Sequence, residues 1–283
     1  MASRARAAGP RPRVDDRHLL RLASHLTPRD RQIIRLLYEH RVLTSRQVCD
    51  VAFSSVRRAE ARLHTIYELR VVDRFRPHQW SGSAPYHWVL DDGGAAVIAA
   101  DRGVEVKDWP WRKERALALA DSATLAHRVG TNGFFTALLR DQQTHSDRRL
   151  SIWWSAWRCA EEWGRIVRPD GYGVWNEPGA RVPFLLEYDR GTESGTRLAE
   201  KLPGYRDLLS VAVAPTAVLF CFPSAGREAA ARRALVDGPP TLATAVLSPG
   251  VNPADAVWLT LAGSRRVRLT ETVSTPVPAP QSG

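Results

Sequence analysis

The sequence predicts an α+β protein made of two consecutive parts. Over the first hundred residues, three segments with helical spacing of apolar residues are followed by two short segments with strand alternation. From about residue 113 onward, helical and strand patterns alternate, which is typical of a mixed sheet covered by helices. Most of the net charge of +10 lies in residues 1–80, which hold 17 arginines, no lysine and 8 acidic residues. This excess at one end indicates a polyanionic partner.

Three helix starts are marked by capping residues in the first part. Thr27 precedes Pro28, which suits the first helical position, and Thr44 with Gln47 forms a capping box. A third helix follows the serines at 54 and 55 and ends near residue 70. Strands are expected to begin near residues 71 and 86, with turn-forming residues 80–85 between them, and a small alanine-rich helix is expected at about 94–103.

Three helices followed by a hairpin predict a winged helix-turn-helix domain over residues 18–103. Its third helix carries arginines and Thr65 on the face opposite the predicted core, and a helix of this kind fits the DNA major groove. The residues assigned to DNA are Arg46, Arg57, Arg58, Arg62, Thr65, Arg74 and Arg76, with His78 also in the hairpin. The alternative is a solvated basic face used for protein contacts, but the charge asymmetry favours double-stranded DNA.

The flanking segments and the second part follow from composition and period. Residues 1–17 are expected to form a disordered basic arm, 104–112 a linker, 113–262 an α/β domain with a mixed central sheet, and 263–283 a disordered tail. A long helix is expected over about 113–142, interrupted near Gly130 and Gly133. Strands are predicted at 149–155, 166–175, 182–189, 216–222, 242–248 and 256–261, with helices from about 195 and at 225–236.

Three carboxylates stand out because they lie next to apolar strands. Strand alternation places Glu187 and Asp189 on one face, and Asp170 precedes a neighbouring strand. Carboxylates grouped in this way are typical ligands of a hard divalent cation. Lys201 is one of three lysines in the chain and falls between Leu198 and Leu202 on an inward helical stripe, although Pro203 is expected to end or kink that helix.

The pattern of Pro169-Asp170 followed by Glu187-x-Asp189 resembles the PD-(D/E)xK nuclease superfamily. More closely, the chain resembles the replication-relaxation proteins of actinobacterial plasmids and mobile elements. This resemblance covers about residues 25–225. Besides the N-terminal winged helix, the matching residues are His127, Asn132, the run Arg168 to Asp170, the run Leu186 to Thr192, and the run Lys201 to Tyr205.

The resemblance implies a restriction-endonuclease-like domain. Asp170 and Glu187, with Asp189, would bind Mg²⁺ or Mn²⁺, and the catalytic residues would be Asp170, Glu187 and Lys201. The superfamily's lysine position holds Asp189 here, and Lys201 is its replacement. Two functions stay open: a metal-dependent DNA nuclease or nickase, and a non-enzymatic regulator of replication or transcription in which the carboxylates form only a structural ion-pair network.

The expected setting is the cytoplasm. No apolar run reaches the length of a membrane span, and no apolar segment of a secretory signal follows the N-terminus. The three cysteines Cys49, Cys159 and Cys221 are odd in number and far apart, which fits neither a disulfide framework nor a zinc site. Besides DNA, the expected partners are plasmid replication or mobilisation proteins and a second copy of the chain.

Overall fold

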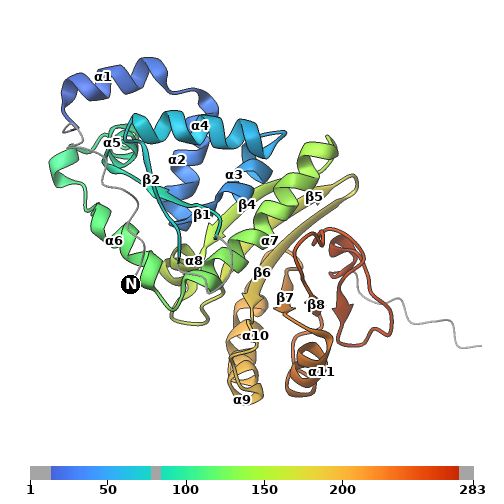
Figure 1. Cartoon of the computed structure of the whole chain (residues 1–283). Helices are drawn as coiled ribbons and strands as arrows, with labels where there is room; N and C mark the ends of the chain where they lie inside the picture. Colours follow the sequence, from blue (N-terminus) through green and yellow to red (C-terminus); the bar gives the residue numbers. More distant parts are fainter. Residues whose placement is uncertain (1–13, 78–83, 274–283) are drawn as a thin grey trace, which may run out of the picture. The chain divides into compact units, whose positions relative to one another are not determined.

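The computed structural model describes residues 14–77 and 84–273, and the chain divides into two compact units, Met1–Thr136 and Ala137–Gly283 (Figure 1). Within the described residues the fold is α+β, as predicted, and unit 2 contains a mixed six-stranded sheet. The predictions for the N-terminal arm up to residue 13, for His78 and most of the hairpin turn, and for residues 274–283 lie outside the described residues.

Three of the first five helices of unit 1 begin at the predicted caps. The five helices are α1 (Asp16–His25), α2 (Pro28–His40), α3 (Ser45–Ala52), α4 (Val56–Glu68) and α5 (Asp92–Asp101), and those that begin at the predicted caps are α2, α3 and α4. Thr27 and Thr44 each form a capping box, and the Ser55 side chain accepts a hydrogen bond from the Arg58 backbone N–H. The sequence did not predict α1, which Asp15 caps.

A small antiparallel sheet completes the first half of unit 1. Its strands are β1 (Leu43–Thr44), β2 (Val72–Phe75) and β3 (His87–Leu90), in the order β1-β3-β2. The β2–β3 pair is the predicted hairpin, whereas β1 is too short to show a period in the sequence. Leu43 pairs with Trp88, whose buried indole donates to Ser45 Oγ over 2.9 Å.

Two glycines allow α5 to begin against the backbone that follows α4. A Cβ atom on Gly93 would lie 2.7 Å from the Arg70 carbonyl oxygen, and one on Gly94 would lie 2.3 Å from that of Val71. Both distances are shorter than van der Waals contact, so larger residues would force this helix away.

Residues beyond 112 continue unit 1. The short helix α6 (Lys113–Leu117) and the long helix α7 (Leu125–Thr144) follow the segment predicted to be a linker. Asn132 Nδ2 donates to the Val42 carbonyl over 2.7 Å, and Gln47 Nε2 donates to that of Val129 over 2.7 Å. These bonds explain why the boundary between the units lies after Thr136 and not at 104–112. The helical pattern breaks at residues 118–124, and α7 runs without interruption through both glycines.

The sheet of unit 2 has six strands, and the predicted acidic residues lie at strand ends. It consists of β4 (Arg149–Ser155), β5 (Gly171–Glu177), β6 (Ala180–Tyr188), β7 (Ala217–Phe222), β8 (Leu242–Val246) and β9 (Leu259–Thr260), in that spatial order. Asp170 lies directly before β5, Glu187 lies at the end of β6, and Asp189 directly follows β6. The first three strands are antiparallel, β6, β7 and β8 run parallel, and β9 is antiparallel to β8. Parallel neighbours require crossovers, which the helices after β6 and β7 supply.

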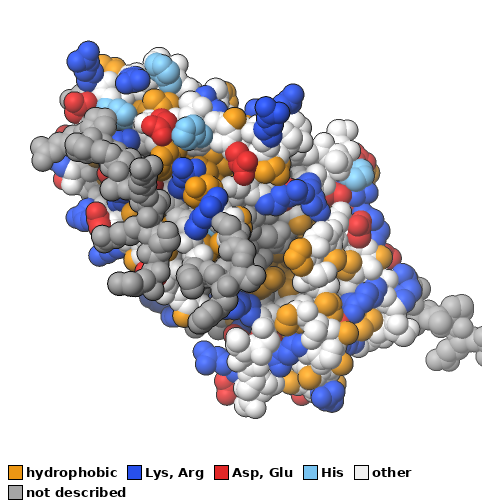
Figure 2. All heavy atoms as spheres, viewed as in Figure 1, with side chains coloured by type: hydrophobic (Ala, Val, Ile, Leu, Met, Phe, Trp, Pro, Cys, Tyr) orange, Lys and Arg blue, Asp and Glu red, His pale blue; other side chains and the backbone are white. Residues whose placement is uncertain are grey.

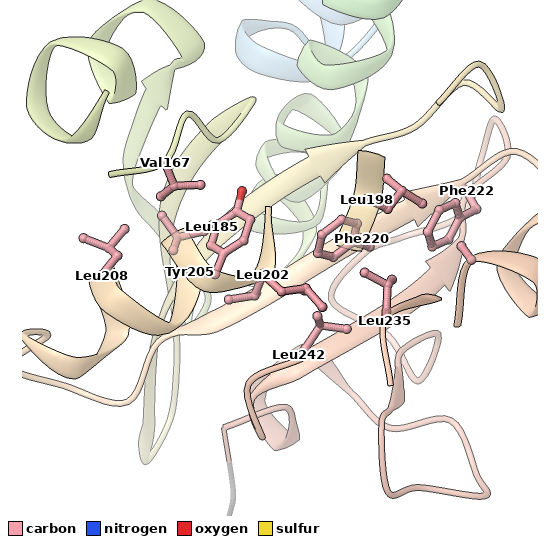
Figure 3. Packing of buried hydrophobic residues seen from close by; sticks show 12 residues of the cluster. Val167, Leu185, Leu198, Leu202, Tyr205, Leu208, Phe220, Phe222, Leu235 and Leu242 are labelled. Carbon is pink, nitrogen blue, oxygen red and sulfur yellow. The ribbon is translucent and has the colours of Figure 1, made fainter. Parts of the chain in front are cut away.

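One face of this sheet packs against helices. These are α8 (Ala156–Trp163), α9 (Gly195–Ala199), α10 (Leu202–Ser210) and α11 (Ala225–Ala234). Figure 3 shows the shared core, in which Leu185 of β6 and Phe220 of β7 lie with Leu198, Leu202 and Tyr205 of α9 and α10. Pro203 lies in the first turn of α10, where its missing N–H costs no helical hydrogen bond. The helix α8 occupies a segment that the sequence did not predict to be helical.

Residues 263–273 do not form the disordered tail that their composition predicted. Leu269 is fully buried, and Arg266 forms an ion pair with the buried Glu228. Arg268 contacts Glu177 of β5 over 2.9 Å. Long-range ion pairs of this kind leave no local pattern in the sequence. None of the helices in the described residues is long and apolar enough to cross a membrane.

Candidate functional site

The exposed face of α4 is the basic surface that the sequence singled out. Ala59, Leu63 and Ile66 are buried, so the opposite side of the helix faces solvent. That side exposes Arg57, Arg58, Ala61, His64 and Thr65, together with Glu60 and Glu68. The Arg58 guanidinium donates to a neighbouring hydroxyl, Ser54 Oγ, over 3.1 Å. In Figure 2, Lys and Arg side chains lie among His and acidic side chains over α1 and α4.

Arg62 does not belong to this exposed face. Its Nε donates to Asp30 Oδ1 over 2.9 Å, and the same guanidinium also contacts Asp30 Oδ2 and the His25 carbonyl. Asp30 lies on α2 with no exposed surface. Burial raises the pKa of Asp30, but hydrogen bonds from Arg62 and Thr27 outweigh it and leave the pKa below its usual value. Arg62, predicted to contact DNA, is therefore tied to a buried carboxylate.

The other arginines predicted to contact DNA, those of the hairpin and of α3, have contacts within unit 1. The Arg74 guanidinium lies 4.1 Å from the ring centroid of Tyr86 and 4.7 Å from that of Tyr67, and Arg76 lies 3.8 Å from the Tyr86 ring. Such cation–π contacts hold the two arginines in place along the hairpin. Arg46 is exposed and pairs with Asp50 on the next turn of α3 over 3.2 Å.

The acidic centre of unit 2 is built around Glu187, near the end of β6. Glu187 is 3% exposed, and its Oε2 accepts a hydrogen bond from Lys201 Nζ over 2.7 Å. Its Oε1 accepts a hydrogen bond from the Tyr205 hydroxyl. Glu193 Oε2 lies 3.0 Å from the Lys201 ammonium on the other side. Lys201 thus lies between two carboxylates, of which Glu187 is the buried one.

Electrostatics set an unusual protonation balance at Glu187. Burial, followed by the negative charge of Asp170, raises the pKa of Glu187 to about 7 against the opposing effect of Lys201. Burial lowers the pKa of Lys201, but the Glu187 carboxylate raises it above its usual value overall. Burial and the Glu187 charge also raise the pKa of Tyr205, so its hydroxyl stays a donor at neutral pH. Glu187 therefore holds its proton to a higher pH than an exposed glutamate does.

Asp170 joins the two strands that carry the centre. Its backbone N–H donates to the Leu186 carbonyl over 2.9 Å, and its Oδ2 accepts from the Tyr188 N–H over 2.8 Å. Asp170 thereby bonds to the backbone of the residues directly before and after Glu187. This position explains the electrostatic effect of one carboxylate on the other.

Asp189 has different partners. Its Oδ1 accepts from the backbone N–H groups of Gly191 and Thr192, and its Oδ2 accepts from Arg227 Nε of α11 over 2.7 Å. Within the described residues no group of three or more His, Cys, Asp or Glu side chains is arranged to hold a metal ion. Of the three predicted ligands, only Asp170 and Glu187 lie together.

Several residues of these sites had no strong signal in the sequence. Tyr205 lies four residues after Lys201, a helical spacing that pointed in hindsight to a shared face. Arg227 and Asp30 act through pairs that span 38 and 32 residues of chain, so only the fold reveals them. Asn132, one of the family-like residues, makes structural hydrogen bonds to the segment after α2.

Comparison with known proteins gives one result. A family model described as replication-relaxation matches residues 34–218, which include α3, α4, the acidic centre, the strands β4, β5 and β6, and the start of β7. The comparisons with curated proteins and with solved structures gave no match.

Proposed function

This chain belongs to the replication-relaxation family, and on that premise we propose that it binds double-stranded DNA during replication or relaxation of a plasmid or mobile element. Unit 1 would make the contact. A DNA partner of this kind implies action in the cytoplasm. Proteins of plasmid replication or mobilisation and a second copy of this chain are further proposed partners.

The topology of unit 1 supports a winged helix. The order α2, β1, α3, α4, β2 and β3, with β1 and β2 on either side of β3, has three helices followed by a hairpin. In this proposal α4 enters the major groove and the hairpin contacts the adjacent backbone. The observation that carries the proposal is the solvent-facing pair Arg57 and Arg58 with Thr65 on one side of α4.

The test is duplex binding by the full chain. Replacing Arg57 and Arg58 together by alanine should weaken binding by about 2 kcal/mol, because two phosphate or base contacts are lost. The matched control is R21A, which removes one exposed arginine of α1 and should leave the affinity nearly unchanged. Equal affinities for wild type and the double variant would refute the assignment of α4.

The geometry of unit 2 favours a second candidate, a metal-dependent DNA nuclease or nickase. The sequence of α7, three antiparallel strands, the helices α9 and α10, and the parallel strand β7 fits the predicted restriction-endonuclease-like domain. Lys201 Nζ donates to Glu187 over 2.7 Å, and the negative charge of Asp170 raises the pKa of Glu187, so two of the proposed catalytic residues act on the third.

The donor set agrees with magnesium only in part. Mg²⁺ is commonly bound by one or two carboxylates with water and substrate phosphates completing the shell, and Asp170 and Glu187 meet that minimum. Asp189 is held by Arg227 and adds no ligand. A bound Mg²⁺ would supply an activated water and charge stabilisation at the phosphate. Lys201 would then leave Glu187 for the scissile phosphate, while Tyr205 keeps its hydrogen bond to the carboxylate.

A supercoiled-plasmid assay with Mg²⁺ or Mn²⁺ separates the nuclease from a non-enzymatic regulator. We expect nicked or linear product with wild type, and loss of product with Glu187→Gln while DNA binding remains. Glu193 still pairs with Lys201 in that variant, so the fold is expected to survive. The control E162Q changes an exposed glutamate of α8. If the plasmid stays uncut and metal does not raise the melting temperature, the nuclease proposal is refuted. The acidic centre would then be a structural ion-pair network in a non-enzymatic regulator.

A further inference from the structure

A cavity of about 300 Å³ in unit 1 is lined by four arginines, Arg41, Arg112, Arg115 and Arg128. The other lining residues that the structure describes are uncharged and include Trp111 and Leu119. The arginines come from separate parts of unit 1: the end of α2, the segment before α6, α6 itself, and α7. Four like charges around one cavity repel one another, and an anion bound inside would lower this repulsion.

Two donors on the lining side chains lack acceptors. Arg128 Nε and Trp111 Nε1 are buried and have no hydrogen-bond partner among the described residues. Buried donors of folded proteins are nearly always satisfied, so each exception calls for an occupant or another explanation. Other buried side-chain atoms without a hydrogen-bond partner lie elsewhere in the described residues, but these two donors line the same cavity.

Several other arginines of unit 1 are paired with carboxylates. Arg62 pairs with Asp30, Arg35 with Asp101 and Arg70 with Asp92. Arg115 and Arg128, by contrast, have no carboxylate partner within the described part of the chain. Burial of Arg128 and the nearby charge of Arg41 both lower the pKa of Arg128, as expected of a guanidinium without a counter-ion.

We propose that this cavity binds a small phosphorylated ligand of the nucleoside-phosphate class. Guanidinium groups bind phosphate oxygens with paired hydrogen bonds, which accounts for the arginines. Trp111 and Leu119 offer an apolar wall for a base or sugar ring. The volume is at the lower end of small-molecule sites, which suits a mononucleotide. The site is separate from the face of α4 and does not depend on its assignment.

The test uses the full chain with AMP, ADP and inorganic pyrophosphate as probes. We expect a saturable rise in melting temperature with each phosphate compound, and none with adenosine or with NaCl at equal ionic strength. Calorimetric titration should show that R115Q and R128Q each weaken binding at least tenfold. R21Q is the control, because it removes one exposed arginine of α1, and its affinity should stay within twofold of wild type.

Three outcomes would overturn the proposal. The first is no saturable effect of any phosphate probe at millimolar concentration. The second is an equal loss of affinity in R21Q, which would indicate nonspecific attraction to the basic unit. The third is displacement of bound AMP by a short duplex in equal amount, which would place a DNA phosphate in the cavity. Should R128Q fold poorly, R115Q at the exposed rim decides alone, and duplex binding through Arg57 and Arg58 is measured separately.

Discussion

The charged side chains on the exposed face of α4 point into solvent, whereas those of the acidic centre beside β6 are buried and paired within the protein. On α4, Arg57 and Arg58 face solvent without a carboxylate partner among the described residues. In the acidic centre, Glu187 is buried and both of its oxygens accept hydrogen bonds from the protein itself. A cluster of charged residues in the sequence therefore indicates a binding surface only where the fold leaves their charge unneutralised.

Within unit 1, Arg62 is a charged residue that the fold neutralises. It lies one helical turn from Arg58, yet its guanidinium is held by Asp30 on α2. Buried ion pairs cost desolvation that their attraction barely recovers, but breaking one leaves an uncompensated charge. Structural charges should therefore respond to mutation through stability, and exposed charges through binding.

The largest expected effect is at Lys201. Replacing it by alanine removes the cation that pairs with Glu187 while the nearby Asp170 charge stays, which should cost about 4 kcal/mol of unfolding free energy at pH 8. At pH 5 the cost should be smaller, because Glu187 then holds a proton. Urea unfolding at both pH values measures it, with K107A as a control at an exposed surface pair. Equal stability of K201A and wild type at pH 8 would break the contrast between the two regions.

The next effect is the pH dependence that Glu187 confers. Its pKa is about 7 in the folded chain and 4.5 when unperturbed, so between these values the folded state keeps a proton that the unfolded state has lost. Its stabilising contribution is full below pH 4.5 and is lost as the pH rises through 7. Wild type should therefore lose about 3 kcal/mol relative to E187Q between pH 4.5 and 8. A constant difference over that range, from denaturant titrations, would mean that a fully charged pair holds the centre.

A smaller effect is expected when Arg62 and Arg58 are compared. Arg62→Ala removes the partner of Asp30 and should cost about 2 kcal/mol, a value reduced because Arg62 is partly exposed. Arg58→Ala should change stability by less than about 0.5 kcal/mol. Thermal and urea unfolding of the two variants test this directly. Similar stabilities would show that Arg62 is as free as its neighbour and would restore it to the DNA-facing surface.

The parts of the fold that local chemistry determines could be predicted. Thr27 followed by Pro28 predicted the start of α2, and the capping box of Thr44 and Gln47 predicted the start of α3. The alternation of apolar residues located β4 and β7 nearly to the residue. The two-residue strand β1 could not be predicted, because it forms only by pairing with β3, more than forty residues away.

The candidate sites show the same limit. The helical stripe that contains Lys201 indicated an inward-facing side chain, and the structure places its ammonium on Glu187. Glu187 and Asp189 are two residues apart but have different partners. Asp189 pairs with Arg227, which lies 38 residues further along the chain and could not be identified from the local sequence. Residues 263–273 likewise lack a local pattern and are held by Arg266 and Arg268 on distant carboxylates.

The most direct test of the DNA-binding account is the salt dependence of duplex affinity for wild type and for the variant with Arg57 and Arg58 replaced by alanine. Each neutralised phosphate contributes a slope of roughly −0.9 to the logarithm of affinity against the logarithm of salt concentration. The account predicts a slope less steep by up to two such contributions in the variant, with unchanged unfolding free energy. Parallel lines for the two proteins would contradict it, because α4 would then make no contact with the DNA backbone.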